Sequence, residues 1–251
     1  MQLLGDIVRK TGESRLLAVE AAKASKAFEI GRDSGLFSVP KVVSFDDEAG
    51  VLEFERLSDL VTLLDLAVHN DQRLPGLLRQ AGQALATVHQ ELVLPEEMKH
   101  ELPPEWMAPS GENVFIHGDF ACINVCFHEP TDELVLLDWS AAPLVGRIPT
   151  FGSRTFDILL FISSLFHGAP WRRAFNWNAK EMADIFLRGY RGVAPEVRLD
   201  NLKNYSSQIC RLQRRNIRQL TARRKTLRAI GFICHQMFMN IRLWLFLKGH
   251  Q

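Results

Sequence analysis

The chain has few cysteines and no apolar leader of the kind that directs secretion. Its four cysteines, Cys122, Cys126, Cys210 and Cys234, lack the spacing of a disulfide framework. The first ten residues contain no apolar run long enough for a signal peptide. These two absences exclude the small disulfide-stapled secreted class, and we expect a protein of the reducing cytoplasm.

No uninterrupted apolar run is long enough to cross a membrane. The nearest candidate, residues 230–247, is broken by His235, Gln236, Asn240 and Arg242. Polar and charged side chains are costly inside a bilayer, so this stretch favours a buried helix over a spanning one. The sequence therefore predicts no transmembrane segment.

Acidic residues are absent from positions 201–251, which carry eleven Lys and Arg, while residues 1–200 have a balance of −10. A solvated helix face normally mixes both signs, so this tail indicates an anionic partner. Nucleic acid is not favoured, because no recognition motif accompanies the arginines and few aromatic residues alternate with them. We expect two helices over about 198–248, with a break near 223–226 or at Gly231. Four arginines recur at helical intervals on the first of them: Arg211, Arg214, Arg215 and Arg218.

The most informative part of the sequence is residues 114–140. Its pattern predicts a strand, a tight loop, a second strand, a turn and a third strand. Three polar residues lie at strand ends or in the loop between strands. These are Asp119, Asn124 and Asp138. Strand ends backed by an apolar sheet are rigid places to hold reacting groups, so we predict the active site here.

The spacing of these residues indicates phosphoryl transfer. That reaction needs a carboxylate to orient and deprotonate a hydroxyl, and oxygen ligands to hold Mg²⁺ against a triphosphate. Kinase catalytic loops place the base five positions before a metal-binding Asn, and a metal-binding Asp follows on the next hairpin. We therefore predict Asp119 as the base, Asn124 and Asp138 as metal ligands, and ATP and Mg²⁺ as cofactors.

The motif HGDxxxxN, followed by a strand ending in Leu137-Asp138-Trp139, resembles the aminoglycoside phosphotransferase and choline kinase-like family. The resemblance is specific over 114–140 and weaker from about residue 6 to 165. It implies an α+β, bilobal protein-kinase-like fold, with a reduced N-terminal lobe over 1–57 and a mainly helical C-terminal lobe over 58–251. It also implies transfer of the γ-phosphate of ATP to an acceptor hydroxyl. His117 and Asp157 would support the catalytic loop.

In the first lobe we expect a strand over Leu3 to Lys10, a helix over about 15–30 that ends at Gly31, and a hairpin turning at 46–50. The resemblance implies that a cation of the strand contacts the α- and β-phosphates and pairs with Glu20. Lys10 is favoured for this role and Arg9 is the alternative, since one residue of shift turns the side chain to the other face. The alternative interpretation makes Lys10, Glu20 and Lys23 solvated charges at the strand end and on the helix. Glu55 and Leu57 fall at the lobe connection, where adenine would bond to the backbone.

The sequence departs from the family pattern before Lys10. Two further strands and a glycine-rich loop over the phosphates would need about twenty residues, but only five precede Asp6. A degenerate kinase fold that acts as a binding or scaffold module is therefore the alternative function. A zinc site at His117, Cys122, Cys126 and His128 is weaker, because the spacing lacks a paired CxxC pattern and leaves Asp119 without a role.

The arginine-rich helix also bears on the acceptor. In the family the C-terminal helices wall the acceptor site, and cationic acceptors such as choline would require carboxylates there. A basic wall instead predicts an anionic acceptor, such as a sugar bearing phosphate or carboxylate, or an anionic glycolipid. Contact with the inner membrane surface through the basic C-terminal helices is a related expectation.

Overall fold

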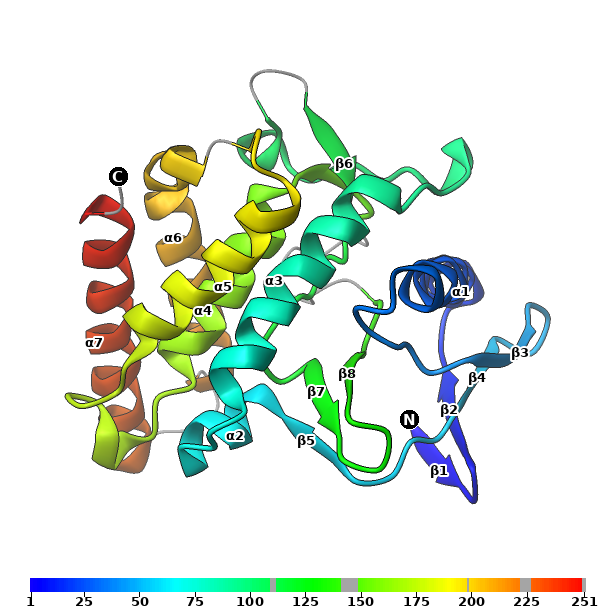
Figure 1. Cartoon of the computed structure of the whole chain (residues 1–251), viewed down its shortest axis with the longest axis horizontal. Helices are drawn as coiled ribbons and strands as arrows, with labels where there is room; N and C mark the ends of the chain where they lie inside the picture. The colour runs from blue at the N-terminus through cyan, green and yellow to red at the C-terminus, as the bar shows by residue number, and fades with distance from the viewer. Residues whose placement is uncertain (109–111, 141–148, 198, 222–226, 250–251) are drawn as a thin grey trace.

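The computed structural model describes residues 1–108, 112–140, 149–197, 199–221 and 227–249. Figure 1 shows a small lobe of sheet and one helix around the N-terminus, beside a larger lobe made mainly of helices. The predicted bilobal α+β fold is confirmed. The boundary at residue 57 stays a prediction, and the chain passes from the first sheet to the second between Glu55 and Leu60.

The N-terminal lobe is an antiparallel sheet with the strand order β1-β2-β4-β3, covered by α1. Its elements are β1 Gln2–Leu4, β2 Ile7–Thr11, α1 Ser14–Ser34, β3 Val42–Asp46 and β4 Val51–Glu55. The buried small and aliphatic side chains of α1 recur at helical spacing and include the fully buried Ala24 and Ala27. The predicted hairpin turn at 46–50 is confirmed between β3 and β4.

The prediction of one strand from Leu3 to Lys10 was wrong. Gly5 has φ +58°, and the chain folds back there so that β1 pairs antiparallel with β2. Glycine adopts this left-handed conformation without a Cβ clash, which allows a tight turn at Gly5-Asp6.

Helix α1 also ends later than predicted. Gly35, with φ +64°, caps the helix through a hydrogen bond from its N–H to the Gly31 carbonyl. Gly31 itself lies inside α1, where a Cβ would come within 2.5 Å of the Phe37 carbonyl oxygen. The earlier glycine therefore serves close packing, and the later one ends the helix.

The C-terminal lobe contains two small sheets and six α-helices among its described residues. β5 Leu60–Thr62, β7 Val125–His128 and β8 Glu133–Leu136 form a sheet of order β5-β7-β8, and β6 Asn113–Phe115 pairs with β9 Phe151–Ser153. The helices are α2 Leu63–His69, α3 Leu74–Glu91, α4 Thr155–His167, α5 Ala179–Val193, α6 Ser206–Thr221 and α7 Leu227–Gly249. Short 3₁₀ segments are η1 Glu96–Met98, η2 Pro104–Trp106, η4 Trp171–Arg173 and η5 Leu199–Tyr205.

Helices α3 and α5 cross in close contact. A Cβ at Gly82 would lie 2.2 Å from the Phe186 carbonyl oxygen, and one at Gly189 would lie 2.0 Å from that of Arg79. The two glycines let the backbones approach and bring Tyr190 of α5 against His89 of α3. His89 in turn contacts Asp157, which accepts a backbone N–H of the catalytic loop.

The segment after α1 ties the two lobes together. Ser38 N–H donates to the Leu134 carbonyl at 2.8 Å, and Leu136 N–H donates to the Ser38 carbonyl at 2.9 Å. The short N-terminal connector thus adds to the edge of β8, immediately before Leu137 and Asp138. The position of Asp138 is thereby coupled to the N-terminal lobe.

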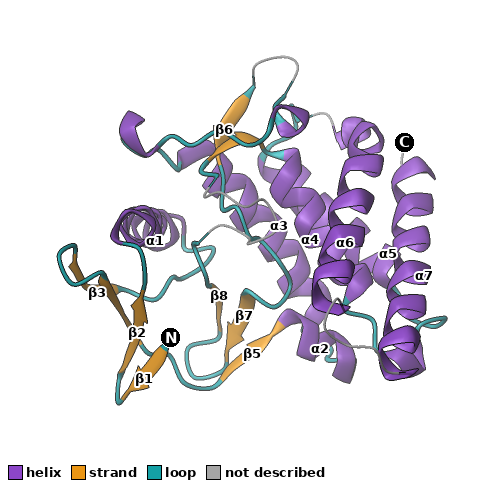
Figure 2. Ribbon diagram, turned by 180° about the vertical axis from the view of Figure 1, so that it is seen from behind, coloured by secondary structure: helices purple, strands orange, loops and turns teal. Residues whose placement is uncertain are grey.

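Two helices occupy the C-terminal stretch, as predicted. The break near 223–226 lies outside the described residues, between the end of α6 at Thr221 and the start of α7 at Leu227. The alternative break at Gly231 is wrong, because this residue lies within α7. Figures 1 and 2 place α6 and α7 at the end of the long axis that is farthest from the N-terminal lobe.

Candidate active site

A pocket of about 310 Å³ lies where β2 and α1 face the hairpin of β7 and β8. Its walls are apolar around the lobe connection, with Val39, Phe54 and Leu60, and polar on the side of the catalytic loop. Six residues predicted for the site line it together: Lys10, Glu20, Glu55, Leu57, Asn124 and Asp138. One apolar wall and one wall of charged groups suit a flat ring joined to an anionic chain.

Lys10 connects the two lobes inside this pocket. Its Nζ donates to Glu20 Oε1 at 2.5 Å and to Asp138 Oδ1 at 2.8 Å. Burial alone would lower the pKa of Lys10, but the charges of Glu20 and Asp138 outweigh it, so the pKa is raised and the ammonium stays charged. Arg9 points to the other face of the sheet and pairs with Glu53 at 2.7 Å. Of the two candidates, Lys10 faces the pocket.

The catalytic loop holds Asp119 against Asn124. Asn124 Nδ2 donates to the Asp119 carbonyl oxygen at 2.9 Å and to Asp119 Oδ2 at 3.1 Å. Burial, together with the charge of Asp138, raises the pKa of the Asp119 carboxyl to about 7. A carboxyl with a pKa near 7 can take up a proton at physiological pH, which is the property required of a general base.

Asp157 braces the same loop from below. Its two carboxylate oxygens accept the His117 N–H at 2.7 Å and the Gly118 N–H at 2.9 Å. His89 Nε2 lies 3.0 Å from Asp157 Oδ2, and His89 Nδ1 lies 2.9 Å from the Tyr190 hydroxyl. His89 is buried, and its two contacts link Asp157 to Tyr190 of α5.

His117 anchors the loop through the packing of its ring and a hydrogen bond to the backbone. Its ring is fully buried between Trp139 and Phe120, with centroids 4.3 and 5.4 Å away. Burial, reinforced by the nearby charge of Lys23, lowers the pKa of His117 to about 4, so the ring is neutral at pH 7. The Asp119 N–H donates to His117 Nδ1 at 3.3 Å. The ring therefore orients the backbone of the residue proposed as base.

Lys23 is the functional residue that sequence reasoning missed. It is fully buried, and its Nζ donates to the backbone carbonyl of His117. Burial lowers the pKa of Lys23 to about 8, although the charges of Asp157, Glu20 and Asp119 oppose the shift. The interpretation of Lys10, Glu20 and Lys23 as solvated charges is therefore wrong. A signal was present: Lys23 follows Glu20 by three positions and precedes the buried Ala27 by four, so it shares their helix face.

The donors around Asp138 suit a hard cation. Asp138 has φ +57°, and its Oδ1 accepts from Lys10 and, at 2.7 Å, from the Ser140 hydroxyl. Asn124 directs its amide nitrogen to Asp119, which leaves its amide oxygen as the acceptor end within the pocket that Asp138 also lines. One carboxylate and one amide oxygen match what a protein offers Mg²⁺ when phosphates and water complete its shell.

The zinc alternative finds no support in the geometry. Among the described residues no three His, Cys, Asp or Glu side chains gather as a metal-binding group. Burial raises the pKa of the Cys122 thiol to about 11 and that of Cys126 to about 12. Zinc binds the thiolate form, which these environments disfavour.

The four arginines predicted to wall the acceptor site lie exposed along α6: Arg211, Arg214, Arg215 and Arg218. Within the described part of the chain, no hydrogen bond or ion pair joins them to Asp119, Asn124 or Asp138. Helix α6 packs against α7, α4 and η5. The structure does not bring the arginines into the pocket around Asp138, and their acceptor role stays a prediction.

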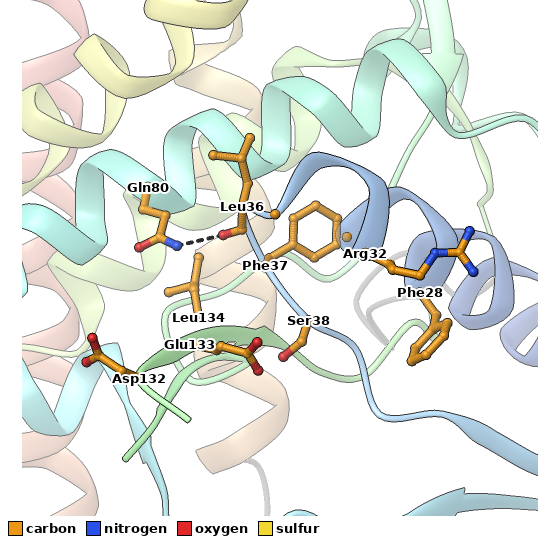
Figure 3. Close-up of a pocket in the computed structure, with 11 residues that line it drawn as sticks. Phe28, Arg32, Leu36, Phe37, Ser38, Gln80, Asp132, Glu133 and Leu134 are labelled. Atoms are coloured by element: carbon orange, nitrogen blue, oxygen red, sulfur yellow. Dashed lines mark hydrogen bonds between the residues drawn. The ribbon is translucent and has the colours of Figure 1, made fainter. Parts of the chain in front are cut away.

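A second hollow, of about 350 Å³, lies behind the hairpin of β7 and β8 (Figure 3). The end of α1 contributes Arg32, and the hairpin contributes Asp132 and Glu133. Gln80 of α3 donates to the Leu36 carbonyl at 2.7 Å, as the dashed line in Figure 3 shows. None of the predicted site residues lines this hollow, and the Gln80 bond fixes the connector that carries Ser38 onto β8.

No protein-family model matches the chain, and no curated protein sequence matches it. Solved structures do match. A choline/ethanolamine kinase family protein from Mesorhizobium loti is 16% identical with a TM-score of 0.56, over 98% of this chain and 88% of that one. A glucosamine kinase in complex with glucosamine, ADP and inorganic phosphate is 12% identical with a TM-score of 0.57, over 88% and 71%. An amicoumacin kinase in complex with AMP-PNP and Ca²⁺ is 16% identical with a TM-score of 0.51, over 94% and 80%. The chain has the protein-kinase-like fold that these small-molecule kinases share.

Proposed function

We propose that the protein is an ATP-dependent phosphotransferase that moves the γ-phosphate to a hydroxyl of a small-molecule acceptor. The observation that carries the proposal is the convergence of Lys10, Glu20, Asn124 and Asp138 on one pocket, with Asp119 held by Asn124. Neighbours of the same fold are kinases, and two of them were solved with ADP or AMP-PNP.

Each residue has a distinct task in this reaction. Asp119 accepts the proton of the acceptor hydroxyl, whose oxygen bonds to the γ-phosphorus while the bond to the β,γ-bridging oxygen breaks and ADP leaves. Lys10, steadied by Glu20, binds the α- and β-phosphates. His117 and Asp157 hold the backbone of the loop so that Asp119 keeps its orientation.

Asn124 and Asp138 are the residues that would hold Mg²⁺. When bound, the ion neutralises charge on the phosphates. Lys10 donates to Asp138, which orients the carboxylate within the pocket. Glu55 and Leu57 lie at the lobe connection and line the apolar end of the pocket, where an adenine ring would be enclosed.

The acceptor is a sugar or a related alcohol in this proposal. A glucosamine complex of the same fold supports a sugar-sized acceptor. The finer prediction of an anionic acceptor, including an anionic glycolipid, depends on the four arginines of α6 alone, which lie outside the pocket around Asp138. An acceptor panel therefore has to contain neutral, cationic and phosphorylated members.

A binding module of the same fold is the second candidate. The hairpin of β1 and β2 turns at Gly5-Asp6, with Gly5 the one glycine in this turn. Kinases use a longer glycine-rich hairpin in this region to cover the phosphates. Binding of Mg-ATP without loss of its γ-phosphate under any acceptor would favour this candidate.

The deciding experiment is ADP formation from ATP across that panel: neutral sugars, amino sugars, sugar phosphates, choline and an anionic glycolipid. The proposal expects acceptor-dependent ADP formation and a phosphorylated product by mass spectrometry. ATP binding with no product from any acceptor contradicts it and leaves the binding module. Turnover of cationic acceptors alone would keep the phosphotransferase and remove the anionic-acceptor prediction.

A further inference from the structure

Helix α7 exposes an apolar stripe that no described element covers. Its members are 41–58% exposed and lie 7, 11, 14 and 15 positions after the first, which are helical repeats: Ile230, Met237, Ile241, Trp244 and Leu245. This spacing places them on one helix face, which we call the α7 stripe. The opposite side packs into the core, where Met239, Leu243 and Leu247 are fully buried. The helix is thus apolar on both its inner and its outer face.

Two exposed aromatic side chains extend the apolar surface beyond α7. Phe175 is 84% exposed, and its ring lies 5.1 Å from that of Phe238. Trp171 is largely exposed, and its ring lies 5.3 Å from that of His235. Both belong to the segment between α4 and α5, beside the first half of α7 (Figure 1). Exposed Arg172 lies between them in sequence.

Helix α6 adds positive charge to the same end of the molecule. It packs against α7, and its four arginines are exposed. The α7 stripe also ends near the exposed Lys248. Positions 201–251 contain no Asp or Glu to balance these cations. Figure 2 places helices α6 and α7, which carry these apolar and cationic side chains, at the end of the molecule remote from the N-terminal lobe.

We propose that this end of the protein docks on an anionic lipid bilayer, with the α7 stripe in the interfacial layer and the α6 arginines against the headgroups. A bilayer surface supplies negative charge and hydrocarbon together, which matches the two kinds of side chain. From Ile230 to Leu245 the stripe is about 22 Å long, so α7 lies along the surface. By length and composition α7 could also cross a membrane, but its inner face is packed against α6 and α4.

A second copy of the chain fits the surface less well. A face shared by two copies would bring the arginine-rich α6 helices of both copies near each other, without acidic residues from 201–251 to separate them. Like charges at close range oppose such contact. This inference is independent of the proposed catalysis, because it concerns residues outside the pocket and is measured as binding.

The test is cosedimentation of the full chain with vesicles of phosphatidylcholine alone or mixed with phosphatidylglycerol. We expect pelleting with the anionic vesicles only, weakened by salt because exposed charges are screened. The double variant Ile241→Ser/Trp244→Ser tests the stripe, and Arg214→Gln/Arg218→Gln tests the arginines. Each should weaken binding to anionic vesicles at least tenfold. The control is Val93→Ser, which removes an apolar side chain that is 66% exposed in the segment after α3 and should change nothing.

Two results would overturn the inference. One is the absence of pelleting by the wild-type chain, or pelleting that the stripe and arginine variants leave unchanged. The other is a dimer by light scattering that Ile241→Ser/Trp244→Ser dissociates, which would assign the surface to a second copy. Matching circular dichroism spectra and thermal midpoints confirm that the variants fold. A change in KM for a soluble acceptor in Arg214→Gln/Arg218→Gln, with vesicle binding intact, would return the arginines to the acceptor site.

Discussion

Lys23 Nζ donates a hydrogen bond to the backbone carbonyl of His117 and so joins helix α1 to the catalytic loop. One turn earlier on the same helix, Glu20 accepts from Lys10 of β2. A single helix therefore contacts both the cation proposed to bind phosphate and the loop that carries the proposed base. Any shift of α1 would disturb both halves of the site together.

Replacing Lys23 with methionine should lower both stability and turnover. The methionine fills the space but leaves the His117 carbonyl without its donor and removes positive charge facing Asp157 and Asp119. Loss of a buried hydrogen bond to a charged group costs about 1.5–3 kcal/mol. Urea unfolding measures the free energy, and ADP formation measures turnover.

The matched control is Lys26→Met, three positions along the same helix. Lys26 pairs at the surface with Glu29, and surface substitutions of this kind change stability by about 0.5 kcal/mol or less. Equal losses in the two variants would show that Lys23 has no special role beneath the loop.

Lys10→Met and Arg9→Met should differ sharply. Lys10 faces the pocket beside Glu20 and Asp138, whereas Arg9 pairs with Glu53 on the other face of the sheet. We expect Lys10→Met to weaken ATP binding at least tenfold, about 1.4 kcal/mol, and Arg9→Met to change it less than twofold. Calorimetry with a non-hydrolysable ATP analogue gives both values. Similar losses for both variants would contradict the assignment of Lys10.

Asp119→Asn should abolish transfer while it spares nucleotide binding. Asparagine keeps the shape and the contact with Asn124 but cannot accept the hydroxyl proton. General-base loss typically lowers kcat by about 10²–10⁴-fold. The control is Asp132→Asn, the same chemical change at an exposed hairpin position whose φ of +58° asparagine tolerates. Normal turnover in Asp119→Asn would remove Asp119 as the base.

The raised pKa of Asp119 predicts how the free energy of unfolding of the metal-free protein changes with pH. Burial raises its pKa to about 7 in the folded protein, against about 3.9 in an unfolded chain. The folded state therefore binds this proton more tightly, and stability is lost as the pH rises through 7. Relative to wild type, Asp119→Asn should gain about 2–4 kcal/mol between pH 4 and pH 8. A difference that stays constant with pH, as expected for Asp132→Asn, would contradict the raised pKa.

The sequence was sufficient to predict which residues of the catalytic hairpins meet. Asp119 and Asn124 are five apart around a tight loop, and Asp138 ends the next hairpin, so local geometry alone brings them near one another. The fold class followed from the same motif. The turn at Gly5 and the end of α1 were harder to predict. The helix was expected to end at Gly31, but Gly31 packs against Phe37 inside the helix and Gly35 caps it.

Helical spacing places Lys23 on the same face as Glu20 and Ala27, but that spacing does not tell whether the face is buried. A lysine within a helix is normally solvated, and Lys23 is enclosed only because α1 packs on the catalytic loop. The exposure of the outer face of α7 could not be predicted either. A helix that is apolar on two opposite faces has no single apolar stripe, so the sequence does not tell which side, that of Trp244 or that of Leu243, faces the core.

Calorimetric titration with AMP-PNP tests, without knowledge of the acceptor, whether Asp138 and its neighbours bind a nucleotide together with Mg²⁺. Asparagine at 138 keeps the left-handed backbone and removes only the charge. We predict that Mg²⁺ tightens binding to the wild-type chain and to Asp132→Asn at least tenfold and has no effect on Asp138→Asn. If Mg²⁺ leaves nucleotide binding by the wild-type chain unchanged, or tightens it undiminished in Asp138→Asn, Asp138 does not hold a metal ion against the nucleotide.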